Sequence, residues 1–279
     1  MNWDRGRNQY DLHPVVRNYA VHCLPVAEME QIGRKVVDHF TSRPDPPYEA
    51  AETMADVRNG LQVARSLVQI GDMKRAYDMI DDKLTTPLWF NLERYDEYLV
   101  LVRPYFPDGW TKPPQGLESK GSLGILAANA GVALSQLGRT TDALAVDQYT
   151  IPDAVREKSL YSLCNRLRNH CYHLMNAARM EAAERVLLLE EEGAAMSNEE
   201  DRACALSQRV DYLMDLGRLT EAEAALDRLK AGPRPTSRAR YRLGEVETNL
   251  VRLRLCQNRL NEDVFSVAML AASEGKIEV

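Results

Sequence analysis

The strongest pattern in this chain is a recurring spacing of hydrophobic and small residues around a turn residue. Leucine stands four places before the turn in four of five copies, and alanine stands five places after it in four copies. Residues four, seven and eleven places before one position share a face of an α-helix, so each turn follows a predicted amphipathic helix. The pattern therefore predicts helical hairpins. The five turn positions are Gly71, Gly138, Ala178, Gly217 and Asn258.

The position seven places before each turn holds a small or medium-sized side chain. Its occupants are Ala64, Gly131, Cys171, Val210 and Val251. Two antiparallel helices joined by a short turn approach closely only where the facing side chains are short. We therefore expect this position and the alanine five places after the turn to lie at the helix crossing. A larger residue there would overpack the crossing, at a cost of about 1–3 kcal/mol.

We place the hairpins at residues 50–84, 122–151, 159–192, 201–230 and 238–273, with an extra helix at 89–103. All 13 prolines then lie outside the hairpins, with Pro152 just after the second. This distribution supports the boundaries, because proline inside a helix costs about 3 kcal/mol. The predicted fold class is all-α, with an N-terminal helical segment at residues 1–45 and a repeat domain at residues 46–279.

Charge and composition mainly exclude classes of protein. A net charge of −6 offers no basic surface for nucleic acid. Residues 1–9 are polar, and the longest uncharged run, 121–138, contains Asn129, Ser135 and Gln136, so we expect neither a signal peptide nor a membrane span. Five cysteines without a secretory signal indicate reduced thiols and a cytoplasmic protein.

Two groups of residues invite a chemical interpretation. Cys164, His170, Cys171 and His173 resemble a zinc set in composition. On a helix, however, the two cysteines share a face and the histidines point elsewhere, so the four cannot surround one ion and we expect no metal site. The acidic run Glu190 to Glu192 is interpreted as the solvent-facing end of a helix. No nucleophile and base stand at a recognisable spacing, and we expect no cofactor and no enzyme activity. A catalytic site assembled from distant residues stays open as an alternative.

The Gly-x-x-x-x-Ala turn, with leucine four places and a small residue seven places before it, resembles the tetratricopeptide repeat (TPR). TPR units usually repeat every ~34 residues, whereas the last four turns here are spaced 39 to 41 residues apart. The resemblance implies a right-handed α-α superhelix of about five hairpins, whose first helices line a groove for a protein or peptide ligand.

Residues on the first helices that lie off the packing face are the candidates for that groove. Tyr172 with Asn165, Arg168 and Asn176 is the best single cluster, because it combines a rigid ring with adaptable polar groups. The alternative for every candidate is an ordinary solvated helix face. The candidates are Arg58, Arg65, Gln69, Asn165, Arg168, Tyr172, Asn176, Asp211, Asp215 and Arg252.

A second resemblance involves Tyr10 to Ala20, which reads YDLHPVVRNYA. It is similar to the end of the winged-helix module in STAND proteins, signal-transducing ATPases with numerous domains, which continues directly into TPR-like repeats. In that family the matching histidine, here His13, lies beside bound ADP. The alternative is that His13 only ends a loop before the helix-starting Pro14. Gly116 to Ser122 has the wrong order for a phosphate-binding loop, so we expect no ATP hydrolysis by this chain.

Together the resemblances imply a sensor domain of a bacterial STAND-type signalling NTPase, acting in regulation or anti-phage defence. Its partner would be a protein or peptide, or the NTPase core of the same or another chain, and neither nucleic acid nor membrane. The main alternative is a free-standing TPR scaffold or adaptor protein. A helical-repeat enzyme is the less favoured reading.

Overall fold

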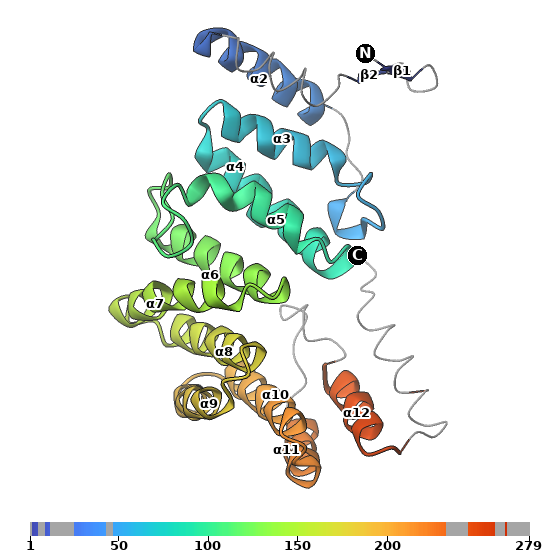
Figure 1. Cartoon of the computed structure of the whole chain (residues 1–279), viewed down its shortest axis with the longest axis vertical. Helices are drawn as coiled ribbons and strands as arrows, with labels where there is room; N and C mark the ends of the chain where they lie inside the picture. Colours follow the sequence, from blue (N-terminus) through green and yellow to red (C-terminus); the bar gives the residue numbers. More distant parts are fainter. Residues whose placement is uncertain are drawn as a thin grey trace. The chain divides into compact units, whose positions relative to one another are not determined.

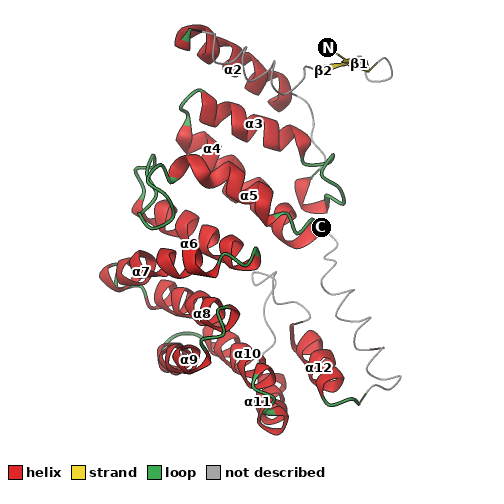
Figure 2. Ribbon diagram, in the orientation of Figure 1, coloured by secondary structure: helices red, strands yellow, loops and turns green. Residues whose placement is uncertain are grey.

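The computed structural model describes residues 2–4, 9–11, 25–42, 47–232 and 245–259, together with Ser266. Helices dominate these residues, as Figures 1 and 2 show, and the predicted all-α class is confirmed. The start of the chain differs from the predicted helical segment. There β1 (Asn2–Asp4) and β2 (Gln9–Asp11) pair antiparallel, with Trp3 opposite Tyr10.

The chain divides into two compact units, residues 1–105 with 115–118 and residues 106–114 with 119–279. The division lies beside Tyr105 rather than at the predicted position 45. It does so because α2 (Val26–Thr41) packs against α3 (Arg58–Gln69) and shares one apolar core with it. That core contains the buried side chains of Val37, Val63, Leu67 and Ala76.

The first hairpin of the first unit differs from its predicted bounds. The helix α3 starts at Arg58 rather than near residue 50, where Tyr48–Ala50 form a 3₁₀ turn. After α4 (Met73–Met79) the chain continues in two π-helical segments, Ile80–Leu84 and Pro87–Asn91. Pro87 is the first residue of the second segment and follows Thr86, whose backbone is also helical. The helix α5 (Tyr95–Val102) and a 3₁₀ turn, Arg103–Tyr105, complete this unit.

The second unit consists of stacked helical hairpins. Its helices are α6 (Lys120–Gln136), α7 (Thr140–Arg156), α8 (Leu160–Asn176), α9 (Met180–Ala195), α10 (Glu199–Asp215), α11 (Leu219–Ala231) and α12 (Glu245–Cys256). The pairs α6–α7, α8–α9 and α10–α11 pack together, and each first helix also packs on the first helix of the next pair. The second helix of the predicted fifth hairpin lies outside the described residues.

All five predicted turn residues have a left-handed backbone. The residue after each turn donates its N–H to the carbonyl four places before the turn, as from Arg139 to Leu134 at 2.8 Å. This bond is the mark of a Schellman motif, which satisfies the last carbonyls of a helix. The φ angles are 77° at Gly71, 73° at Gly138, 56° at Ala178, 71° at Gly217 and 54° at Asn258.

The alanines five places after four of these turns are completely buried, which confirms the repeat register. They are Ala76, Ala143, Ala183 and Ala222. The small first-helix position meets the second helix as predicted, because Cys171 Sγ lies 3.5 Å from the carbonyl oxygen of Ala183. At Gly131, an added Cβ would lie 3.4 Å from Val146, so a larger side chain would displace its neighbours.

The predicted end of the second hairpin at residue 151 is wrong, because α7 continues through Pro152 to Arg156. Proline cannot donate to the carbonyl of Gln148, yet the following turn still forms and Glu157 donates to Asp153 at 2.9 Å. One lost hydrogen bond near the end of a helix is therefore tolerated when the remaining turn is capped.

Candidate functional site

A line of polar contacts joins three successive first helices in the second unit. Tyr172 on α8 donates its hydroxyl to Asp211 Oδ2 on α10 at 2.8 Å. Arg252 on α12 forms an ion pair with the other oxygen of Asp211. All three residues stand six places before their turns, so the repeat itself places them side by side. We name Tyr172, Asn176, Asp211, Asp215 and Arg252 the first-helix strip.

Asp215 is the charged member of the strip for which the described residues show neither a hydrogen bond nor an ion pair, although the charge of Arg252 acts on it. It is exposed, one helical turn after Asp211 on α10, and among the described residues nothing donates a hydrogen bond to it. Partial burial of its carboxylate raises the pKa of Asp215, the charge of Asp211 adds to the rise, and Arg252 opposes it. A cationic or hydrogen-bond-donating group of a ligand would relieve this unfavourable setting.

Amide-to-hydroxyl bonds also cross-link the first helices. Asn176 on α8 donates from Nδ2 to Ser135 Oγ on α6 at 2.9 Å. Asn249 on α12 makes the same contact with Ser207 Oγ on α10, again at 2.9 Å. The side chains along this face are therefore held in place before any ligand arrives.

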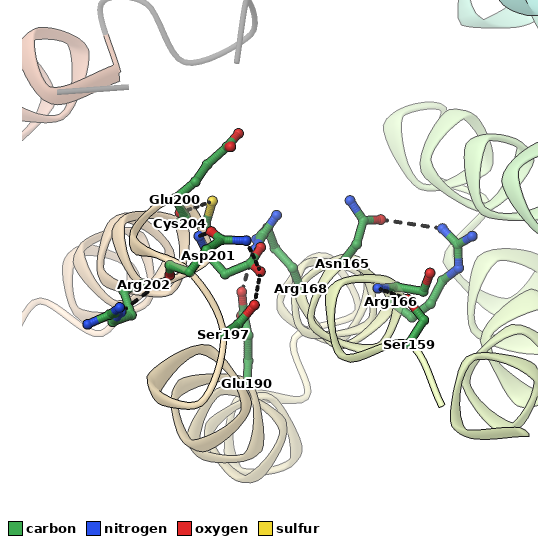
Figure 3. Close-up of polar contacts among 12 residues, drawn as sticks. Ser159, Asn165, Arg166, Arg168, Glu190, Ser197, Glu200, Asp201, Arg202 and Cys204 are labelled. Atoms are coloured by element: carbon green, nitrogen blue, oxygen red, sulfur yellow. Dashed lines mark hydrogen bonds and ion pairs between the residues drawn. The ribbon is translucent and has the colours of Figure 1, made fainter. Parts of the chain in front are cut away.

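Arg168 does not belong to the strip, and its prediction as a groove residue is corrected. Its side chain is 12% exposed and donates from Nε to Glu190 Oε1 at 2.9 Å, while Nη2 lies 3.8 Å from Asp201 Oδ1. Figure 3 shows these side chains converging from three helices. Arg168 thus joins α8, α9 and α10 in the interior because two carboxylates neutralise its charge there.

Glu190 is completely buried, which contradicts its predicted solvent-facing position. It continues the inner face of α9 after Ala183 and Leu187 and before Ala194, all of them buried. The helical spacing of these residues was the signal that sequence reasoning missed.

The remaining candidates lie elsewhere. Asn165 is half-buried near the start of α8 and accepts a hydrogen bond from Arg166 Nη1 at 3.3 Å (Figure 3). Arg58, Arg65 and Gln69 are exposed on α3 in the first unit, where Arg65 pairs with Glu97 at 2.7 Å. His13 lies outside the described residues.

A buried His-Asp-His cluster also escaped the sequence analysis. Asp147 on α7 is 4% exposed, and its Oδ2 lies 2.8 Å from Nδ1 of His170 and 2.8 Å from Nδ1 of His173, both on α8. The prediction that these histidines point away from Cys171 agrees with this arrangement. The histidines contact α7, whereas Cys171 packs against α9.

Three of the described thiols, those of Cys164, Cys171 and Cys204, are buried as packing residues are. Burial raises the pKa of Cys164, and it raises the pKa of Cys171 to about 12, so neither is primed as a nucleophile. The four cysteines in the described part of the chain are free. Within the same residues, no three His, Cys, Asp or Glu side chains are placed to hold a metal ion.

No helix in the described ranges has the length and apolar character needed to cross a membrane. Comparison with models of protein families, with curated proteins and with solved structures found no match to this chain.

Proposed function

We propose that the chain is a recognition module whose second unit binds a protein or peptide on the first-helix strip. The observation that carries this proposal is the contact line Tyr172–Asp211–Arg252 with Asp215 beside it. Tyrosine and arginine contribute most of the binding energy at many protein interfaces. Side chains already held by hydrogen bonds also lose little conformational freedom on binding, which favours affinity. The proposed ligand is a polypeptide rather than nucleic acid or a membrane.

The wider proposal is a TPR-like right-handed superhelix that serves as the sensor arm of a bacterial, cytoplasmic STAND-type NTPase. The repeated left-handed turns and buried alanines support the TPR-like part, and the YDLHPVVRNYA segment supports the STAND part. Ligand binding would bias an off–on equilibrium in an NTPase core of the same or another chain, in regulation or anti-phage defence. The chain itself is proposed to have no enzyme activity.

Asp215→Asn tests the recognition proposal with little risk to the fold. Proteins captured by the wild-type chain from a lysate of its host would be quantified by mass spectrometry. The variant should retain at most a tenth of the specifically captured protein. A tenfold loss of affinity corresponds to ~1.4 kcal/mol of binding free energy. Asp227→Asn is the matched control, since Asp227 is an exposed aspartate on the second helix α11. Equal capture by both variants would show that the strip is not the binding surface.

The sensor proposal is tested by the size of the protein in its host. Mass spectrometry of the endogenous product should find peptides upstream of Met1 that contain a phosphate-binding loop, or an NTPase that co-purifies with the chain. A product near 31.6 kDa with no such companion would instead support a free-standing scaffold.

A further inference from the structure

Carboxamide side chains stand at one fixed position of every repeat. The residue nine places before each turn is asparagine or glutamine in all five copies. Helical spacing puts this position on the same face as the positions two and six places before the turn, which is the face of the first-helix strip. The first of these residues belongs to the first unit and the other four to the second. They are Gln62, Asn129, Asn169, Gln208 and Asn249.

Two of the four carboxamides in the second unit fasten neighbouring first helices together. Gln208 on α10 is completely buried and donates from Nε2 to the main-chain carbonyl oxygen of Arg168 on α8 at 2.8 Å. Asn249 on α12 is 3% exposed and donates from Nδ2 to Ser207 Oγ on α10 at 2.9 Å. In both cases the acceptor stands ten places before the turn of the preceding repeat. These two carboxamides are therefore part of the fold.

The other two carboxamides, Asn129 on α6 and Asn169 on α8, make no such contact. Each residue is half-buried, and no group in the described part of the chain forms a hydrogen bond with its side chain. We name these two residues the amide pair. A carboxamide carries an N–H donor and a carbonyl acceptor side by side, and a main-chain peptide unit presents the same two groups. The amide pair can therefore bind the backbone of a polypeptide whatever its side chains are.

The spacing of the two helices suits an extended ligand. The helices α6 and α8 pack against each other, and Asn176 on α8 reaches Ser135 on α6 with a hydrogen bond of 2.9 Å. Packed helices lie about 8–10 Å apart, and an extended chain advances about 3.3 Å per residue. An extended peptide that crosses from α6 to α8 would thus meet the amide pair at positions about three residues apart. A helical ligand keeps its main-chain groups bonded internally and offers few of them to the amide pair.

The first-helix strip offers a different chemistry on α10. Both carboxylate oxygens of Asp211 are engaged, since Oδ2 accepts from Tyr172 and Oδ1 pairs with Arg252. Asp215, one turn later, is exposed and forms no ion pair within the described residues. This part of the strip therefore has two carboxylates and one guanidinium, which leaves an excess of negative charge. A lysine or arginine side chain brings hydrogen-bond donors and the missing positive charge.

We propose that the ligand of the second unit is an extended basic peptide. Asn129 and Asn169 hold its main chain, and Asp215 binds a lysine or arginine side chain where the peptide passes α10. This inference rests on the proposed function, because it names the class of ligand for the same surface. It also assigns two roles, since hydrogen bonds to the main chain give affinity and contacts with side chains give specificity.

The probe is a library of random peptides of about nine residues, long enough to cross three helices at about three residues each. The immobilised full chain captures the library, and mass spectrometry identifies the bound peptides. We expect lysine and arginine to be enriched about threefold to fivefold at one position, the range that a partly exposed ion pair provides. Asp215→Asn should abolish this enrichment. Asp227→Asn, on the second helix α11, should preserve it.

The amide pair is tested by affinity rather than by preference. N129A/N169A should weaken each captured peptide about tenfold without changing the preferred position, because the loss of two neutral hydrogen-bonded contacts is of that order. Gln148→Ala, which removes an exposed carboxamide from the second helix α7, is the matched control. Methylation of the main-chain nitrogens of a captured peptide should weaken its binding to the wild type in the same way. This last measurement requires no variant and so does not depend on how N129A/N169A folds.

The outcomes separate this inference from the proposed function. Captured peptides without a basic preference, or peptides that bind N129A/N169A and the wild type equally well, would overturn the inference. The proposed function would survive that result if Tyr172→Ala still abolished capture while circular dichroism showed unchanged helicity. Capture of no peptide beyond the level of an unrelated helical protein would overturn both.

Discussion

Two of the five left-handed turn residues, Ala178 and Asn258, are not glycine. Asparagine tolerates this backbone because its short polar side chain bonds locally, but alanine meets a clash between its Cβ and the next carbonyl. At Gly138 an added Cβ would touch no neighbouring atom within 4 Å, so the cost of a side chain there would be conformational alone. A substitution at Gly138 should therefore lower the stability of the fold, and a substitution of Ala178 by glycine should raise it.

Gly138→Ala should lower the free energy of unfolding by about 1–2 kcal/mol, because L-residues are strained in this region. Ala178→Gly should raise it by about 0.5–1 kcal/mol, since relief of the strain outweighs the greater entropy of the unfolded chain. Urea unfolding measures both. Ala177→Gly is the control for the second change, because Ala177 has an ordinary φ of −87° and should lose stability on substitution. A loss of stability in Ala178→Gly would contradict the proposed strain.

At the scale of elements, the two helices of each hairpin pack closely at their crossing, and this close packing requires a small residue there. Ala222 is completely buried on α11, and the core around it contains Val210 on α10 and Leu253 on α12. Because helices in such a stack contact mainly their neighbours, damage at one crossing should stay near that crossing.

Ala222→Trp should therefore destabilise α10–α12 far more than α6 and α7. Overpacking is expected to cost about 1–3 kcal/mol, with faster amide hydrogen exchange in α10, α11 and α12. Ala224→Trp provides the comparison, since Ala224 is exposed on the same helix and should leave exchange unchanged. Uniform exchange throughout the second unit in Ala222→Trp would mean that the hairpins unfold together.

At the scale of the whole molecule, the sequence predicted the contacts that recur with the repeat and did not predict the contacts that occur only once. The turns and crossings could be found because glycine, leucine and alanine recur at fixed offsets that mirror the helical period. The contacts of Asp147 with His170 and His173 join residues 23 and 26 places apart, and no local pattern encodes them. The strip was predicted in part. Its positions follow from the repeat, but the burial of Arg168 depends on Glu190 and Asp201, which reach it from two other helices.

The Arg168 interaction also limits how such a chain can drift in evolution. Loss of Arg168 would leave the buried carboxylates of Glu190 and Asp201 uncompensated, at a cost of about 3–5 kcal/mol, whereas replacing the whole group by apolar side chains is often neutral. Arg168, Glu190 and Asp201 stand on three different helices, and a single substitution of Arg168 would be the most damaging change in the group. Proteins that descend from this sequence should therefore retain all three residues or replace all three together. Substitutions at these positions on the three helices would then be correlated.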